Sequence, residues 1–193
     1  LAERLYENLG EDEIRLNQSV TTTSRKSDGW NVETAEETFE CRNLVLALPV
    51  NASLALLSNF AATPPLSAIP EARIVTIAMG FGPEASLPPG FGYLTPEKEQ
   101  RFCLGALFSS NMFPGRAPKA HILLEALVGG RRHPERLELD DDTLIQKAVQ
   151  DLQQLLNLPK PPRYARVLRP RWGIPQLEKG YPALLEWRNN MIK

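Results

Sequence analysis

Short apolar runs separated by glycine, proline and charged residues recur along the chain, and their spacing predicts a mixture of strands and helices. The densest series lies between Gly90 and Gly130, where three runs follow one another: FGYL, CLGALFSS and HILLEALVGG. Such runs are typical of strands in an antiparallel meander. The β-branched run ARIVTIAMGF precedes them and predicts a central strand of the same sheet.

The connection between the second and third runs, NMFPGRAP, combines two prolines, a glycine and an arginine. Proline fixes its own φ and glycine reaches conformations that other residues avoid, so this composition predicts a rigid loop of defined shape. Loops held between strands are frequent sites of function.

The N-terminal region predicts a helix, a meander and a buried strand. Residues 1–9 place leucines on one helical face that ends before a glycine. Apolar residues alternate with polar ones over residues 14–20, where a strand is expected to begin, and Asp28-Gly29 marks a hairpin. Residues 44–48 are apolar on both faces, which is typical of a parallel strand covered on both sides.

Two further helices are expected. Asn51 is positioned to cap a short helix over residues 52–57. Asp140, Asp141 and Asp142 provide capping and helix-dipole charge for a longer one. The apolar stripe of that helix would cover one face of the sheet; it consists of Leu144, Ile145, Ala148, Val149, Leu152, Leu155 and Leu156. Prolines then end the helix, and YARVLRPRWGIPQ reads as an extended segment.

Composition narrows the function classes. At 193 residues the chain can hold one complete domain plus part of another. A net charge of −1, from 22 basic and 23 acidic residues, offers no field that would attract nucleic acid. Cys41 and Cys103 lack CxxC spacing and are expected to be buried free thiols, and with only two histidines no metal centre is predicted. The longest apolar region, LVLALPVNASLALL, is interrupted and shorter than the roughly 20 residues of a spanning helix.

The segments GFGYLTPEKEQ, LGALFSSNMFPGRAP and LVGGRR, in this order and spacing, resemble the substrate domain of the protoporphyrinogen oxidase family, flavoproteins of haem biosynthesis in the flavin amine oxidase superfamily. LAERL, IRLNQSV, NLVLALP and RWGIPQ match the middle and late portions of the same family, so the resemblance covers the whole chain. The last two are widespread among flavin amine oxidases, whereas LFSSNMFPGRAP followed by VGG is specific.

Family members open with a strand–GxGxxG–helix unit that holds the FAD pyrophosphate, and this sequence contains no such motif. The chain is therefore expected to be an internal fragment of a longer enzyme. The resemblance implies an α/β fold of α+β character. Residues 1–63 would form part of an FAD-binding domain with a three-stranded meander and a buried strand. Residues 64–166 would form a substrate-binding domain with a mixed, largely antiparallel sheet covered by helices, and residues 167–193 would return to the FAD domain.

The resemblance also implies a set of site residues. Val20 would contact the adenine end of FAD through its backbone, and Trp172 would lie near the flavin. Leu94, Leu107 and Leu127 would line the substrate pocket. For each of these five, ordinary packing is the competing interpretation. No catalytic acid–base residue is assigned, because in flavin chemistry the cofactor accepts hydride while the protein supplies position and shape.

The implied activity is oxidation of protoporphyrinogen IX to protoporphyrin IX, with dioxygen reoxidising FAD. Oxidation of coproporphyrinogen III, another flavin amine oxidase or desaturase activity, and a flavin-free binding protein are the alternatives. The enzyme would lie in the cytoplasm or at the membrane periphery, with any membrane contact made by regions outside the chain. A serine hydrolase built on Ser109, Ser110 and His121 is disfavoured because the GxSxG elbow is absent.

Overall fold

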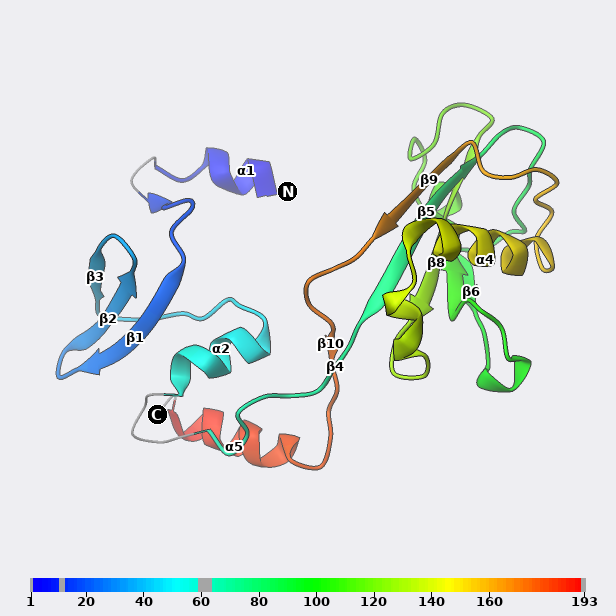
Figure 1. The fold of residues 1–193 in the computed structure, drawn as a ribbon. Coiled ribbons are helices and arrows are strands. Elements are labelled where there is room, and N and C mark those ends of the chain that lie inside the picture. The colour runs from blue at the N-terminus through cyan, green and yellow to red at the C-terminus, as the bar shows by residue number, and fades with distance from the viewer. Residues whose placement is uncertain (1, 11–12, 59–63, 192–193) are drawn as a thin grey trace. The chain divides into compact units, whose positions relative to one another are not determined.

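The computed structural model of the protein describes residues 2–10, 13–58 and 64–191, which form two compact units (Figure 1). Unit 1 contains the described parts of residues 1–69 and 177–193, and unit 2 contains residues 70–176. Thr63, the expected end of the first domain, lies outside the described residues. The roles that the resemblance gives to the domains stay predictions.

Unit 1 contains the expected three-stranded antiparallel meander, with strand order β1-β2-β3. Its elements are α1 (Ala2–Glu7), β1 (Val20–Lys26), β2 (Gly29–Thr34), β3 (Thr38–Cys41), α2 (Val50–Leu57) and α5 (Tyr181–Met191). Lys26 pairs with Gly29, so Ser27 and Asp28 form the two-residue hairpin turn. Gly29 has a φ of +143°, and a Cβ there would collide with the carbonyl oxygen of Cys41, so only glycine fits this turn.

Two strand predictions in unit 1 are wrong. Residues 14–16 belong to no strand, and β1 starts at Val20, because Asn17 adopts a φ of +61° that interrupts extended backbone. Residues 44–48 also form no strand, and Val45 is 85% exposed. A parallel strand needs neighbours that satisfy its N–H and C=O groups on both sides. Among the described residues no strand pairs with this apolar run.

Asn51 does not cap α2 as expected. Pro49 occupies the N-cap position, and Asn51 lies in the first turn, where its side chain bonds the backbone of Ile69. The amide nitrogen Nδ2 donates to the Ile69 carbonyl at 2.9 Å, and Oδ1 accepts from the Ile69 N–H at 2.7 Å. This pair of bonds fixes Ile69 against Leu54 and Leu184, and the three side chains form the buried core of unit 1.

Unit 2 is built on a five-stranded antiparallel sheet with the order β6-β7-β8-β5-β9. The predicted meander is confirmed as β6, β7 and β8, and the β-branched run forms β5 beside β8. The elements of unit 2 are β4 (Glu71–Ala72), β5 (Ile74–Phe81), β6 (Gly92–Leu94), η2 (Glu97–Glu99), β7 (Gly105–Leu107), α3 (Ser109–Met112), β8 (Ile122–Gly129), η3 (Pro134–Glu138), α4 (Asp141–Gln153), β9 (Tyr164–Leu168) and β10 (Ile174–Pro175).

The core of unit 2 lies between one face of this sheet and α4, which crosses the sheet in Figure 1. Alternate residues of β5 point into this core, and Val75, Ile77, Met79 and Phe81 are at most 3% exposed. The capping prediction for α4 is confirmed, because the Thr143 N–H donates to Oδ1 of Asp140 at 2.9 Å. The buried stripe of α4 consists of Leu144, Ala148 and Leu152, each fully buried.

Candidate functional site

The second face of the five-stranded sheet, opposite α4, carries all three residues that the resemblance assigns to the substrate. Leu94 pairs with Gly105, and Gly105 pairs with Leu127, so both leucines point to the same side. Leu107 is two residues from Gly105 on β7 and therefore shares this side. Since Ala106, between Gly105 and Leu107, is fully buried in the core under α4, the three leucines lie on the uncovered face.

Core packing does not account for these leucines within unit 2, because none of them belongs to its hydrophobic cluster. Leu94 is 77% exposed, and Leu107 and Leu127 are half-buried. Their strand positions were predictable from the apolar runs. Their common face follows from the register, which single strands do not reveal. Binding of a substrate to this face stays a prediction.

A pocket of about 270 Å³ opens on the uncovered face at the end of β8. Its lining combines apolar side chains with two cations; the residues that matter below are Ile74, Leu94, Leu104, Leu127, Arg131 and Arg132. Leu107 does not line it. Concave, mostly apolar sites with a few polar groups are typical of small-molecule binding.

Two consecutive glycines place the arginines at this pocket. Gly129 and Gly130 have φ angles of +99° and +68°, and the Gly130 N–H donates to the Arg73 carbonyl at 2.7 Å. A Cβ at Gly129 would press into the side chain of Leu137. The chain therefore turns sharply off β8, and Arg132 donates from Nη1 to the Thr95 carbonyl at 3.2 Å.

Glu125 is a site feature that the sequence reasoning missed. It pairs with Leu107 in the sheet and so lies on the uncovered face, where its Oε1 accepts a hydrogen bond from Ser109 Oγ at 2.8 Å. Ser109 is 1% exposed, so this hydroxyl has little access to water. The available signal was a carboxylate in the middle of the apolar run HILLEALVGG.

The contacts of Ser109, Ser110 and His121 do not form the catalytic arrangement of a serine hydrolase. Ser109 donates to Glu125, and Ser110 exchanges hydrogen bonds with the backbone of Leu123 at 3.2 and 3.3 Å. The ring of His121 pairs with the Lys119 carbonyl at 3.0 Å. Both serines therefore bond residues of β8, and no described contact joins either serine to His121, the base of that alternative.

The loop between β7 and β8 begins as α3 and then turns at Pro114-Gly115. The Arg116 N–H donates to the Phe113 carbonyl at 3.2 Å, and Gly115 has a φ of +86°. These features, with proline first and glycine second, match a type II turn. The predicted defined shape is present, although Pro114 itself is exposed.

Replacing Pro114 with glycine tests whether this turn serves function or only closes the sheet. The change frees an exposed backbone and is expected to cost on the order of 1 kcal/mol of stability, through the entropy of the unfolded chain. We expect substrate handling in the full-length protein to suffer more than this loss explains, seen as a rise in KM. A KM that hardly moves, with activity following the small stability loss, would show that the turn is structural.

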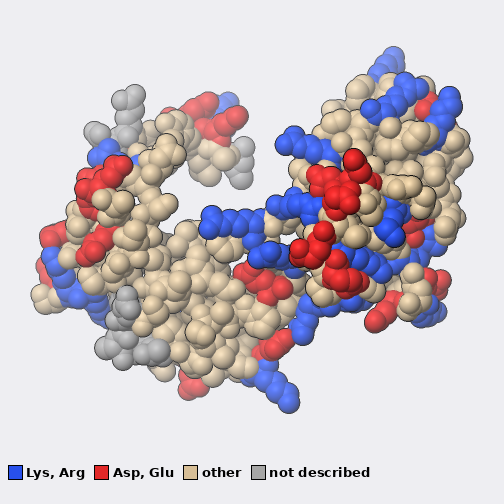
Figure 2. All heavy atoms as spheres, viewed as in Figure 1, with Lys and Arg blue, Asp and Glu red and all other residues tan. Residues whose placement is uncertain are grey.

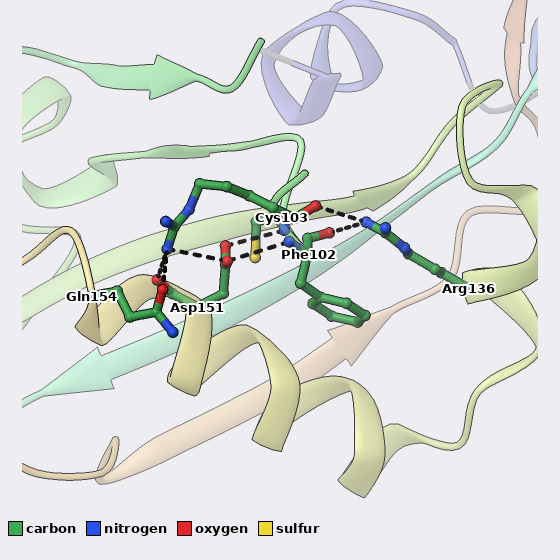
Figure 3. A network of polar contacts seen from close by, with 6 residues as sticks. Phe102, Cys103, Arg136, Asp151 and Gln154 are labelled. Carbon is green, nitrogen blue, oxygen red and sulfur yellow. Dashed lines mark hydrogen bonds and ion pairs between the residues drawn. The ribbon is translucent and has the colours of Figure 1, made fainter. Parts of the chain in front are cut away.

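A buried carboxylate fixes the segment that leads into β7 (Figure 3). Asp151 of α4 is 8% exposed and accepts hydrogen bonds from the backbone N–H groups of Phe102 and Cys103 at 3.2 and 3.1 Å. Arg101 pairs with it at 3.2 Å, and Arg136 donates to the carbonyls of Arg101 and Phe102 from the other side. This network holds β7 in the position that presents Leu107.

The two cysteines are free thiols, of which Cys103 is buried, as expected, and Cys41 is half-buried. Burial raises the pKa of the Cys103 thiol above its usual value, and the neighbouring Asp151 adds to the shift. This thiol is therefore protonated and a poor nucleophile or ligand at neutral pH. The part of the chain that the structure describes contains no group of three or more His, Cys, Asp or Glu residues suited to a metal ion.

The two residues assigned to FAD lie in different units. Val20 opens β1 in unit 1, beside an irregularity in the pairing with β2, and is 39% exposed. Trp172 precedes β10 in unit 2 and is 43% exposed, with the Arg171 guanidinium 4.9 Å from its ring centroid. Both are accessible to a ligand in their own units. Their contact with a flavin stays a prediction.

Charge on the viewed face of unit 2 is mixed. Figure 2 shows lysine, arginine and acidic residues interspersed over the side of unit 2 that carries α4. Within residues 2–10, 13–58 and 64–191, no helix has both the length and the apolar character needed to cross a bilayer.

Sequence comparison relates the chain to flavoenzymes. The family described as flavin containing amine oxidoreductase matches residues 1–184. The mitochondrial protoporphyrinogen oxidase of Nicotiana tabacum is 30% identical over 217 residues, covering 100% of this chain and 42% of that protein. Protoporphyrinogen oxidase 2 of Arabidopsis thaliana is 28% identical and covers 96% of this chain and 40% of its own length. The chain thus spans less than half the length of these relatives.

Structural comparison gives the same fold. A putative protoporphyrinogen oxidase from Exiguobacterium superposes with a TM-score of 0.81 at 23% identity, covering 98% of this chain and 42% of that one. A reduced UDP-galactopyranose mutase superposes with a TM-score of 0.76 at 17% identity over the same shares. The predicted fold class, mixed α/β with mostly antiparallel sheets, is confirmed by this match to part of a flavoenzyme.

Proposed function

Because this chain belongs to the family of flavin-containing amine oxidoreductases, we propose that it forms part of an FAD-dependent oxidase that converts protoporphyrinogen IX to protoporphyrin IX with dioxygen. The relatives named above support the choice of substrate, since the similarity to the tobacco enzyme extends over 100% of the chain. In this proposal unit 2 binds the porphyrinogen and unit 1 contributes to the flavin domain.

The uncovered sheet face is the observation that carries the proposal. A porphyrinogen is a broad, largely apolar macrocycle and needs an extended apolar surface rather than a narrow cleft. Leu94, Leu107 and Leu127 provide such a surface from three adjacent strands. Burying their side chains against a ligand contributes about 25 cal/mol per Å² of apolar area. Binding of a broad apolar ligand to this face is therefore favourable.

Bound FAD supplies the hydride acceptor in this family, and the chain's own residues bind and orient the substrate. The exposed surfaces of Val20 and Trp172 fit peripheral contacts with the cofactor. The pyrophosphate requires a glycine-rich turn at a helix N-terminus, and the sequence contains none.

We therefore expect the 193-residue chain alone to bind no FAD, even though two of its residues would touch the cofactor. The purified chain is incubated with excess FAD, and free FAD is then removed by dialysis. The measurement is the flavin absorbance that remains with the chain. Tight binding in a one-to-one ratio would mean that the phosphates are held by a cradle that the sequence does not reveal.

Steady-state oxidation by the full-length protein tests the proposed activity. Protoporphyrinogen IX should become fluorescent porphyrin in an oxygen-dependent reaction, faster than coproporphyrinogen III. A reversed preference would assign the protein to coproporphyrinogen oxidation. Oxidation of amines but of neither porphyrinogen, or a purified protein without flavin, would overturn the proposal in favour of another oxidase or of a binding protein.

A further inference from the structure

We propose that the pocket at the end of β8 is a subsite for a carboxylate carried on an apolar arm of the ligand, and that Arg132 is the residue that recognises it. The identity of the ligand as a porphyrinogen rests on the proposed function. Protoporphyrinogen fits such a subsite because it carries carboxylated side chains. The subsite itself rests on the pocket and its cations.

The lining of the pocket combines apolar side chains with two cations. The apolar side chains include Ile74, Leu94, Leu104 and Leu127, and the cations, here called the rim, are Arg131 and Arg132, which follow Gly130 where the chain has left β8. An apolar group entering from the sheet face would therefore meet a guanidinium where the apolar surface ends. This arrangement of the lining is complementary to a carboxylate attached to a hydrocarbon arm.

Arg132 has the donors that such an acid needs. Its guanidinium carries five N–H groups in a fixed fork, and the described hydrogen bond to the Thr95 carbonyl uses one of them. That bond restrains the otherwise flexible side chain, so less entropy is lost when a carboxylate binds. Arg131 adds a second positive charge to the same rim.

The size of the pocket limits what it holds. About 270 Å³ is slightly below the roughly 300–1,000 Å³ of complete ligand sites. One arm of a macrocycle fits this volume, and the remaining body would extend over the sheet toward Leu107. The pocket thus supplies orientation, while the wider face supplies contact area.

Glu125 strengthens this orientation. It lies two residues before Leu127 on the same face, which is roughly 7 Å along a strand. A ligand carboxylate is repelled from Glu125 and attracted to the arginines beyond Leu127. The charges along β8 therefore favour one direction of the acid arm, toward the end of the strand.

The test measures binding of protoporphyrin IX and of its dimethyl ester to the full-length protein by quenching of tryptophan fluorescence. Arg132→Gln is expected to weaken binding of the acid at least about tenfold, in line with loss of charged hydrogen bonds, and to leave the ester unchanged. Lys147→Gln removes the same charge from α4, which covers the opposite face, and should change neither ligand.

Arg132→Lys keeps the charge but loses the fork, and should fall between wild type and Arg132→Gln. Equal weakening of acid and ester by Arg132→Gln, or no weakening of the acid, overturns the subsite. A melting temperature equal to that of wild type shows that the variants are folded. For a variant that melts at a lower temperature, the affinity for the dimethyl ester is the control. An ester affinity equal to that of wild type shows that the pocket is intact.

A second pair of probes separates this inference from the proposed function. Decanoate and methyl decanoate differ in the same charge and need no macrocycle site. If the wild-type protein binds no porphyrin but prefers decanoate to its ester through Arg132, the proposed function fails and the carboxylate subsite stands. If it prefers neither acid over its ester, the subsite is wrong whatever the enzyme oxidises.

Discussion

Replacing Asp151 with alanine is expected to lower the stability of unit 2 by about 3–5 kcal/mol, because removing one partner leaves a buried network unsatisfied. The carboxylate accepts from two backbone N–H groups, those of Phe102 and Cys103, and pairs with Arg101. Each buried donor left without a partner costs about 1–3 kcal/mol, and the arginine loses its counter-charge.

Hydrogen exchange in the full-length protein is the suitable measurement for Asp151→Ala, since two units need not unfold together. The slowest amides of β5 and β8 should lose protection by the stated amount. Asp142→Ala, in the exposed first turn of the same helix, is the matched control and should cost only about 0.3–1 kcal/mol through the helix dipole. Equal effects from the two substitutions would mean that the Asp151 network does not stabilise unit 2.

Cutting Leu107 to alanine should damage catalysis more than stability, whereas the same cut at Leu152 should do the reverse. Leu152 belongs to α4 and is fully buried in the core of unit 2, so its truncation leaves a cavity and costs about 2–5 kcal/mol. Leu107 is half-buried on the uncovered face and already borders open space. Removing it takes away contact with the ligand, at about 0.8 kcal/mol per buried carbon, so kcat/KM should fall at least about tenfold.

The comparison requires thermal melts and steady-state porphyrinogen oxidation for both variants of the full-length protein. The result that would contradict the assignment is a melting temperature lowered as much by Leu107→Ala as by Leu152→Ala, together with kcat/KM within about twofold of wild type. Leu107 would then be a core residue, and the substrate face would lie elsewhere.

The sequence predicted what depends on local pattern. The β-branched run in residues 74–81 identified β5 because β-branched side chains favour strands. Asp140 was recognisable as a cap for α4 because a carboxylate before an apolar helical stripe satisfies free N–H groups. The register that brings Leu94 and Leu127 to one face depends on pairing between strands, which these local signals leave open.

The wrong predictions share a dependence on partners distant in sequence. Residues 44–48 have the composition of a buried strand, but composition supplies no neighbouring strand. Asn51 has the chemistry of a helix cap, and its amide instead fits the backbone of Ile69, a residue that local pattern does not bring near. The importance of Glu125 became visible only when the register placed it opposite Leu107.

The most direct test of the proposed oxidase is an anaerobic titration of the full-length, flavin-loaded protein with protoporphyrinogen IX. If the uncovered face presents this substrate to the cofactor, the visible absorbance of oxidised flavin should bleach as each flavin takes two electrons from the porphyrinogen. Admission of dioxygen should reoxidise the flavin and allow the three two-electron steps that yield porphyrin. Leu107→Ala should slow the bleaching while retaining the full flavin spectrum. A wild-type flavin that stays oxidised in the presence of excess protoporphyrinogen IX would contradict the account.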